Sequence, residues 1–208
     1  MEFILLLEVY NLKSKAEKEF EISTADVLRY YIAWKDTDEE LITCIKKDDL
    51  ENFNRFLNIM NIKRNFKKGS TKKVFSKAKE YLNKKPEISD VEVFSDVLFK
   101  AKLLAGKNKN AIVAASKILW MLNKEEIIIQ DSRAKESLKN LIGKKIPDYS
   151  KYCIYWEEQY QFFKTGYLKK IKETKIEMFD AVFKEEWFIR RTFDNYLWSR
   201  GKSKTKSN

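Results

Sequence analysis

Apolar residues recur at every third or fourth position along most of this chain, the spacing that places them on one face of an α-helix. The pattern begins with an apolar stretch, Phe3 to Leu12, that fits either a short strand or a helix. It then predicts helices near residues 24–35 and 36–60, the second beginning at the N-cap residues Asp36-Thr37-Asp38 with glutamates in its first turn. The aromatic residues expected in the core here are Tyr30, Tyr31 and Trp34.

The helical pattern continues through the middle of the chain. A helix is expected to begin at Ser89-Asp90. The segment AIVAASKILWML, from Ala111 to Leu122, is apolar around nearly its whole circumference, which is typical of a buried helix. The run Ile127-Ile128-Ile129 predicts a short, extended and buried linker, and Ala134 to Ile142 predicts the next helix.

Length and composition favour one helical domain. The chain has 208 residues, of which 44% are hydrophobic, so it can bury a substantial core. Five glycines and two prolines leave few residues for the turns of an all-β fold. We therefore predict a mainly α-helical, compact single domain over residues 1–199 and a basic, disordered tail over residues 200–208.

Charge divides the predicted domain into an acidic part, residues 1–60, and a basic part, residues 61–199. Residues 1–60 hold eight basic and thirteen acidic residues, a net charge of −5, whereas the rest of the chain holds 34 and 18, a net charge of +16. Ten basic residues and one acid lie between Lys63 and Lys85, with a flexible tip at Gly69-Ser70-Thr71. Phosphate contacts are therefore expected there. A solvated helix face would give the same charge pattern, and so would the lysine excess that an AT-rich genome favours.

Lys117 is the one charged residue of the apolar segment Ala111 to Leu122. It shares a helix face with Val113, Trp120 and Met121, so its ammonium has to reach water, pair with a carboxylate or lose its proton. A lysine at the helix edge with its head in water is the simpler alternative.

Asp131 follows the isoleucine linker in an N-cap position of the next helix. Capping contributes about 1 kcal/mol, and Asn can take over this role. The capped N–H groups and the helix dipole would also keep the carboxylate ionised. We expect Asp131 to face a cleft beside the helix that carries Lys117.

This order of a buried helix with a lysine, an apolar extended linker and a capping aspartate resembles the helix-hairpin-helix DNA glycosylase superfamily, in particular the 8-oxoguanine DNA glycosylase-like fold proteins. The resemblance covers about residues 103–141, with weaker support from EEWFIRRTFDNYLWSRG near the C-terminus. It implies a protein that binds double-stranded DNA and excises a damaged or modified base, in repair or in defence against foreign DNA. In this family an aspartate stabilises an oxocarbenium-like sugar while a lysine attacks the anomeric carbon, expels the base and forms a Schiff base that permits strand cleavage, a lyase activity. These roles would fall on Asp131 and Lys117.

The predicted hairpin departs from the family pattern L-P-G-V-G-x-K. It reads Leu104-Ala105-Gly106-Lys107-Asn108-Lys109-Asn110, with one glycine in place of two. The family's lysine falls here on Ile112 or Val113, neither of which is a nucleophile. Lys117 lies one turn after Val113 and Lys109 one turn before it. If neither acts, the alternatives are a glycosylase that uses water or a relative that has lost catalysis.

The resemblance also implies a pocket for a flipped base and a set of phosphate contacts. Aromatic clusters from Tyr152 to Phe163 and from Trp187 to Trp198 predict two more helices, although most of their rings should lie in the core. We expect Arg190 and Asp194 to pair on one helix face. The pocket residues expected are Trp120, Trp156 and Trp187. The DNA contacts expected are Lys67, Lys68, Lys72, Lys73, Lys107, Lys109, Arg133 and Arg191.

Missing residue types argue against several classes of protein. Histidine is absent, and Cys44 and Cys153 form no CxxC pair, so we expect no disulfide, no metal site and no cofactor. No Gly-rich run precedes Lys-Ser or Lys-Thr, which argues against a P-loop NTPase. The apolar start is too short for a signal peptide or a membrane span, so we expect a soluble, cytoplasmic protein. Two alternatives to a glycosylase stay open: a non-catalytic nucleic-acid-binding or protein-interaction module of the same fold, and a helical protein unrelated to nucleic acids.

Overall fold

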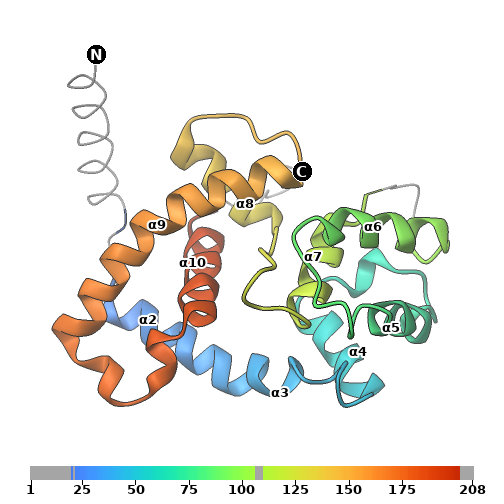
Figure 1. Cartoon of the computed structure of the whole chain (residues 1–208), viewed down its shortest axis with the longest axis horizontal. Coiled ribbons are helices and arrows are strands. Elements are labelled where there is room, and N and C mark those ends of the chain that lie inside the picture. The colour runs from blue at the N-terminus through green and yellow to red at the C-terminus, as the bar shows by residue number, and fades with distance from the viewer. Residues whose placement is uncertain (1–19, 21, 106–109, 202–208) are drawn as a thin grey trace, which may run out of the picture.

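The computed structural model describes residue 20, residues 22–105 and residues 110–201 (Figure 1). Within these ranges the chain is helical and forms no β-strand, which confirms the predicted all-helical class. The apolar opening Phe3 to Leu12, with its expected strand or helix, lies outside the described residues. Residues 106–109 of the predicted hairpin and residues 202–208 of the predicted tail also lie outside them.

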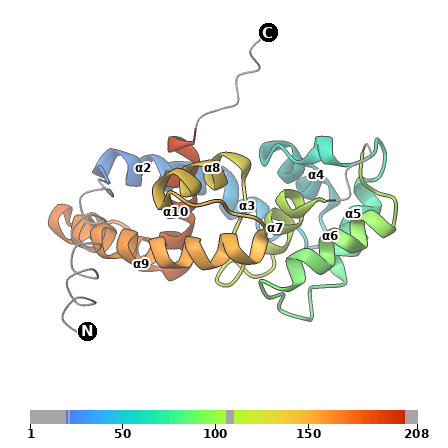
Figure 2. The same cartoon turned by 90° about the horizontal axis from the view of Figure 1, so that it is seen from above.

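The helices form two groups, seen side by side in Figures 1 and 2. One group, which we call the α8–α10 half, consists of α2 (Thr24–Ala33), α8 (Ser132–Ile142), α9 (Tyr149–Thr174) and α10 (Glu186–Arg200). The other, the α4–α7 half, consists of α4 (Leu50–Ile59), α5 (Thr71–Lys79), α6 (Asp90–Lys100) and α7 (Ile112–Trp120). Short 3₁₀ turns occupy Lys63–Asn65 (η2), Ile176–Met178 (η3) and Ala181–Lys184 (η4). The α4–α7 half is thus inserted in the chain between α2 and the last three helices.

The predicted boundary at residue 36 is wrong. Helix α2 continues through a π-helical turn, Trp34–Asp38 (η1), into the short helix α3 (Glu39–Leu41). Thr37 donates its hydroxyl to the carbonyl of Ala33 at 2.6 Å instead of capping a new helix. Asp38 is engaged by Arg191 from α10 at 3.2 Å. A tertiary ion pair therefore holds the side chain that the local pattern assigns to a cap.

The second helix of this region begins later than predicted. Asp49, not Asp36, is the N-cap residue of α4, and its carboxylate accepts a hydrogen bond from the N–H of Asn52 at 2.9 Å. The predicted beginning of α6 is confirmed, because Ser89 is the N-cap residue and Asp90 the first residue of that helix.

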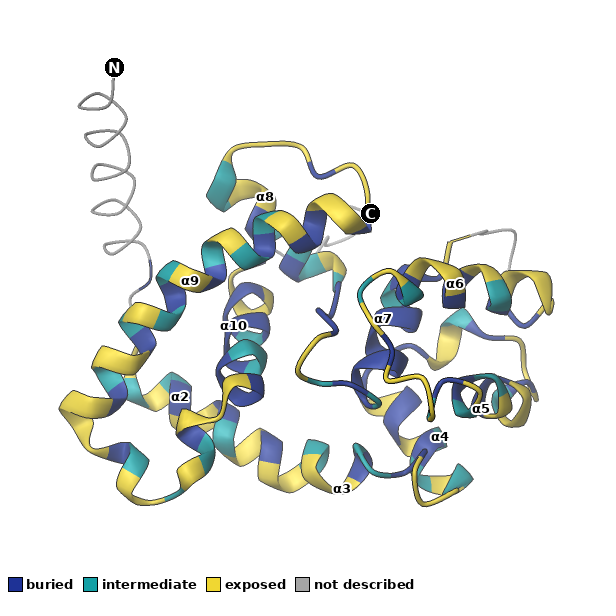
Figure 3. Cartoon of the chain, in the orientation of Figure 1, coloured by how far each residue is buried: buried dark blue, intermediate teal, exposed yellow. Residues whose placement is uncertain are grey.

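The core runs through both halves, and Figure 3 shows α7 and α10 as its most deeply buried helices. In α7 every residue except Val113 is buried, as its apolar circumference predicts. Tyr30 and Trp34 are core residues as expected, whereas Tyr31 is only partly buried.

Both cysteines are buried thiols, and neither is in a disulfide. Burial raises the pKa of Cys44 and of Cys153 to about 12, so both are protonated at neutral pH. In the part of the chain that the structure describes, no helix has the length and apolar content needed to cross a bilayer.

Candidate active site and nucleic-acid interface

Lys117 and Asp131 meet where the two halves adjoin. Asp131 is the N-cap residue of α8, and its Oδ1 accepts a hydrogen bond from the N–H of Arg133 at 2.9 Å. The Lys117 Nζ, from α7, donates to the Asp131 Oδ2 at 2.8 Å and to the carbonyl of Met60 at 3.1 Å. The predicted cap and the predicted proximity of the two side chains are confirmed. The alternative of a lysine with its head in water is wrong, since the Lys117 side chain is 9% exposed.

The linker before Asp131 holds this carboxylate in place. Residues Ile127 to Gln130 are buried, as the apolar run predicts. The N–H of Gln130 donates to the Ser116 hydroxyl at 3.1 Å. The hydroxyls of Tyr149 and Tyr152 donate to linker carbonyls at 2.6 and 3.2 Å. These side chains supply the hydrogen bonds that a neighbouring strand would otherwise provide to a buried extended backbone.

Asp131 is held as a carboxylate. Burial by itself raises the pKa of this group, but the charge and hydrogen bond of Lys117 and the N–H of Arg133 outweigh burial, so the pKa lies below its ordinary value. The Asp131 side chain is still 19% exposed. A lysine nitrogen that donates to two oxygens in an ion pair has no lone pair with which to attack a sugar carbon. The arrangement therefore favours a role for Asp131 over nucleophilic attack by Lys117.

A cavity of about 450 Å³, which we call the amide cavity, is lined in part by Gln130, the residue directly before Asp131 in the chain. It lies at the N-terminal end of α7. Its polar lining is Arg64, Asn65, Asn110 and Gln130. Its apolar lining is Leu104, Ala105, Ala111, Ile112, Val113 and Ala114. Lys117 and Asp131 are not part of the lining, so the ion pair does not face this cavity.

A second cavity, of about 570 Å³, is the cationic cleft beside the N-terminus of α5. Its basic lining residues are Lys63, Arg64, Lys67 and Lys68. Its other lining residues are Leu57, Asn58, Asn61, Phe66, Gly69 and Thr71. Arg64 lines both cavities, so the cationic cleft and the amide cavity adjoin at this side chain.

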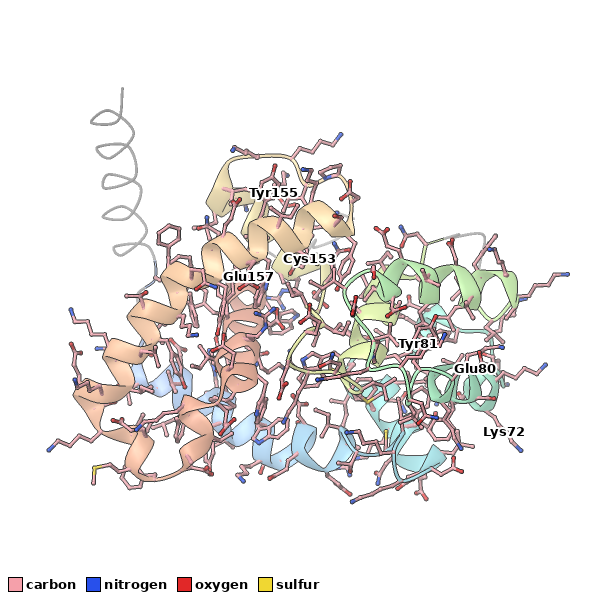
Figure 4. All side chains as sticks on the ribbon, viewed as in Figure 1. Lys72, Glu80, Tyr81, Cys153, Tyr155 and Glu157 are labelled. Atoms are coloured by element: carbon pink, nitrogen blue, oxygen red, sulfur yellow. The ribbon has the colours of Figure 1, made fainter. Side chains whose placement is uncertain are left out.

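Several cations around the cleft are not neutralised by the protein. No salt bridge to a described carboxylate is formed by Lys63, Arg64, Lys67, Lys68, Lys72 or Lys73. Further along the same segment, Lys77 pairs with Glu80 at 2.7 Å and Lys79 with Asp48 at 2.8 Å. Figure 4 shows Lys72 extending from the outer edge of α5. The unneutralised charge thus gathers at the beginning of α5, inside the segment predicted to contact phosphates.

The N-terminus of α5 adds to this positive potential. Ser70 occupies the N-cap position but makes no capping bond, because its hydroxyl donates to the carbonyl of Lys67 at 2.7 Å. Gly69 turns the chain with a φ of +80°, a conformation that favours glycine. The N–H groups of the first turn have no acceptor within the helix, and they lie at the positive end of its dipole. Helix ends of this kind bind phosphate groups.

The basic segment is tied to the connection between α6 and α7. The N–H of Lys67 donates to the carbonyl of Leu103 at 2.9 Å, and the N–H of Ala105 donates to the carbonyl of Asn65 at 2.8 Å. These bonds flank an isolated antiparallel bridge between Phe66 and Leu104. Two regions that the sequence singles out separately, the basic segment and the start of the predicted hairpin, therefore lie side by side.

The other basic residues expected to contact DNA are engaged within the protein or lie outside the described part. Arg133 donates from Nε to the carbonyl of Gly201 at 3.0 Å, and its guanidinium lies 3.9 Å from the ring centre of Trp198. Arg191 pairs with Asp38, and both side chains are at most 15% exposed. A phosphate would have to displace these partners. Lys107 and Lys109 fall in the range that the structure leaves undescribed.

The three tryptophans expected to line a base pocket lie in the core. Trp120 is 2%, Trp156 1% and Trp187 7% exposed. Trp156 stacks on Tyr160, with 5.0 Å between ring centres, and Trp187 packs on Trp34 at 4.4 Å. None of the three lines the amide cavity or the cationic cleft. A base could stack on them only after this packing opened, and their role as pocket walls stays a prediction.

Asp194 is a buried acid whose environment the sequence did not indicate. The expected pair with Arg190 is wrong, because Arg190 instead forms a 2.9 Å ion pair with Glu157. Asp194 accepts a hydrogen bond from the Trp156 indole at 2.9 Å. Burial raises its pKa to about 7, although Arg191, the indole N–H and Arg190 each act to lower it. The one local signal is its place within the aromatic helix α10.

No family model matches the chain, and no curated protein or solved structure matches it. In the described ranges no group of three or more cysteine, aspartate or glutamate side chains is placed to hold a metal ion. Over its described residues this is an all-helical protein with a buried lysine–aspartate pair and a small cavity that adjoins a cationic cleft.

Proposed function

We propose that this protein binds double-stranded DNA and excises a damaged or modified base by cleaving its N-glycosidic bond, in repair or in defence against foreign DNA. One observation carries the proposal. The cationic cleft adjoins the amide cavity at Arg64, and the last residue of that cavity, Gln130, precedes the ionised Asp131 in the chain. A surface for phosphates and a space for a small group therefore adjoin, and a fixed negative charge directly follows the cavity residue Gln130 in the chain.

Binding would be mainly electrostatic. Six cations without a carboxylate partner in the described chain, together with the free N–H groups of α5, can replace the counterions of a DNA backbone. The net charge of +16 over residues 61–208 supports the same role. Neither feature reads a base, so this binding should be independent of sequence.

The proposed chemistry assigns Asp131 to the sugar and favours water as the nucleophile. Cleavage of the glycosidic bond leaves its electron pair on the departing base and positive charge on the sugar, which a nearby carboxylate stabilises. Water then adds to the anomeric carbon, one proton is released to solvent, and the base takes up another. Lys117 keeps Asp131 ionised and oriented instead of attacking the sugar. The ion pair would have to separate before Lys117 could form a Schiff base.

A specific observation favours the second candidate, a non-catalytic DNA-binding protein. Lys117 is satisfied by two oxygens and buried, and neither member of the ion pair lines a described cavity. Such a pair could simply join α7 to α8. This candidate keeps the cationic cleft and predicts no base release.

Charge reversal in the cleft tests DNA binding. The test variant replaces Lys67, Lys68, Lys72 and Lys73 by Glu. The matched control makes the same changes at four exposed lysines of the α8–α10 half, namely Lys145, Lys169, Lys172 and Lys184. Affinity for a labelled duplex is measured by fluorescence anisotropy over a salt titration. For about six phosphate contacts, the wild type should lose roughly 10³-fold in affinity between about 50 and 200 mM salt.

The test variant should bind all duplexes more weakly and with a shallower salt dependence, whereas the control should remain close to the wild type. Equal losses in both variants would show that net charge, not the cleft, drives binding. Unchanged binding by the test variant would remove the cleft from the interface.

Base release from a panel of duplexes with different modified bases separates the two candidates. The freed base is measured directly, and abasic sites are measured by alkaline cleavage. Asp131→Asn should abolish release, and Lys117→Met should reduce it without abolishing it. Borohydride should trap no adduct, and a trapped adduct that Lys117→Met removes would refute the water mechanism. Cleft-dependent binding without release from any duplex would leave the non-catalytic candidate.

A further inference from the structure

The side-chain amide of Gln130 is buried without a partner. The residue is 7% exposed, and its Nε2 has no hydrogen-bond acceptor among the described residues. An unpaired buried donor costs folding free energy, so an atom of this kind calls for an explanation. Gln130 lines the amide cavity, and rotation of its amide about the last side-chain bond would turn this enclosed NH₂ group toward a ligand with a hydrogen-bond acceptor there.

The lining of the amide cavity fits a neutral group with polar atoms at its edge better than an anion. Six of the ten lining residues are small or medium apolar residues, and Arg64 is the single cation. Three of the polar residues are amides, and the Asn110 carbonyl oxygen already accepts the N–H of Ile112 at 2.9 Å, which leaves its NH₂ group to donate. An anion would find four cations in the adjoining cleft, at less cost of desolvation. A volume of about 450 Å³ is within the range of small-ligand pockets.

We propose that the amide cavity receives a single nucleobase of the bound DNA and that Gln130 determines its specificity by donating a hydrogen bond to a ring nitrogen or carbonyl of that base. The inference rests on the DNA binding proposed above and adds the place and the residue of recognition. Arg64 provides the connection, because it lines both the cleft for the backbone and the cavity for the base. A guanidinium in that position can stack on the base plane as well as contact a phosphate.

The position of Gln130 would also connect recognition to chemistry. Its backbone N–H is held by Ser116, and its chain neighbour Asp131 is held by Lys117. Consecutive side chains of an extended segment leave the backbone on opposite sides, so the sugar of a base bonded to Gln130 would have to lie past the linker backbone to face the Asp131 carboxylate. Recognition by this amide would then select the base whose glycosidic bond is presented to Asp131.

Gln130→Met tests the proposal, because methionine keeps the length of the side chain and removes the donor. The probe is a duplex with 2-aminopurine opposite an abasic-site analogue, whose fluorescence increases when the base leaves the stack. A plain labelled duplex measures DNA binding alone. The matched control is Gln161→Met, which changes an exposed glutamine of α9 in the other half. Thermal unfolding confirms that each variant is folded, and Gln130→Met should melt at the same temperature as the wild type or higher.

We expect the wild type and Gln161→Met to increase 2-aminopurine fluorescence. Gln130→Met should bind the plain duplex equally well and need roughly tenfold more protein for the same fluorescence increase, the effect of one hydrogen bond to a buried group. An undiminished response in Gln130→Met would overturn the proposal. Cleft-dependent binding of the plain duplex without any fluorescence increase would also overturn it, while leaving DNA binding in place. Failure to bind the plain duplex would instead refute the proposed function itself.

A second measurement excludes an anion site. In a ¹H–¹⁵N correlation spectrum, the Gln130 side-chain signal is the one that Gln130→Met removes. Millimolar nucleosides should shift this signal, and inorganic phosphate at the same concentration should not. A shift with phosphate alone would make the cavity an anion site and refute base recognition.

Discussion

Replacing Lys117 by methionine should destabilise the protein, although it places an apolar side chain of similar length in a buried position. Removing one partner of a fully buried ion pair costs about 3–5 kcal/mol, because the other charge is left uncompensated. Asp131 is 19% exposed and keeps the N–H of Arg133, so solvent and the cap compensate part of its charge. We therefore expect Lys117→Met to lower the free energy of unfolding by about 2–3 kcal/mol.

The double variant separates the contribution of the ion pair to the free energy of unfolding from the contribution of side-chain packing. Asp131→Asn keeps the cap, which alone would predict a cost below about 1 kcal/mol. It also removes the negative charge beside the Lys117 ammonium, which keeps its hydrogen bond to the uncharged carbonyl of Met60. We therefore expect Asp131→Asn to lower the free energy of unfolding by about 2–3 kcal/mol. Lys117→Met together with Asp131→Asn leaves no buried charge and should cost only about 1–2 kcal/mol. The coupling energy is then about 3 kcal/mol, far above the error of additivity.

Urea unfolding of the four proteins at neutral pH measures this coupling, provided that the slope of the transition is unchanged. Asp131 has a lower pKa in the folded than in the unfolded protein, so its stabilisation is present above the unfolded value of about 3.9 and is lost as the pH falls through the folded value. This acid-dependent loss should disappear in Lys117→Met. If the double variant lost as much free energy of unfolding as the two single variants together, the ion pair would be refuted as a source of stability.

Two further predictions concern stability. Burial raises the pKa of Asp194 to about 7. The folding stability that this group contributes is therefore fully present below about pH 4 and is lost as the pH rises through about 7. Asp194→Asn, which can still accept the Trp156 indole N–H, should therefore stabilise the protein by about 2–4 kcal/mol at pH 8 and by little at pH 4 in urea titrations; an equal effect at both pH values would contradict this. Gly201→Ala should cost about 1–3 kcal/mol, because its methyl group would collide with the backbone of Arg133, and an unchanged melting temperature would refute that contact.

The sequence alone was sufficient for features that depend on near neighbours in the chain. The beginning of α6 at Ser89, the burial of α7 and the N-cap role of Asp131 follow from side chains within one or two turns. The excess charge of the segment after Lys63 is likewise a local property. Each is encoded by spacing and composition, which the tertiary structure does not change.

Local patterns failed where a distant residue competed for the same side chain. Asp38 looked like a helix cap because the backbone N–H groups next to it are the nearest donors in the chain, but Arg191 holds it in the folded protein. Arg190 and Asp194 have the spacing of a helix pair, yet Glu157 and the Trp156 indole are better placed partners. Long polar side chains choose partners by proximity in space, which spacing along the chain does not reveal.

The sequence indicated most residues of the candidate site, and the tertiary structure decided which of them meet. The sequence singled out Lys117 as a charge in an apolar helix and Asp131 as a capping carboxylate, but only packing of α7 against the linker brought them to 2.8 Å. It indicated the basic segment and the predicted hairpin separately, and the bridge between Phe66 and Leu104 made them one surface. It gave no signal for Gln130, because whether a buried amide finds an acceptor depends on every element around it.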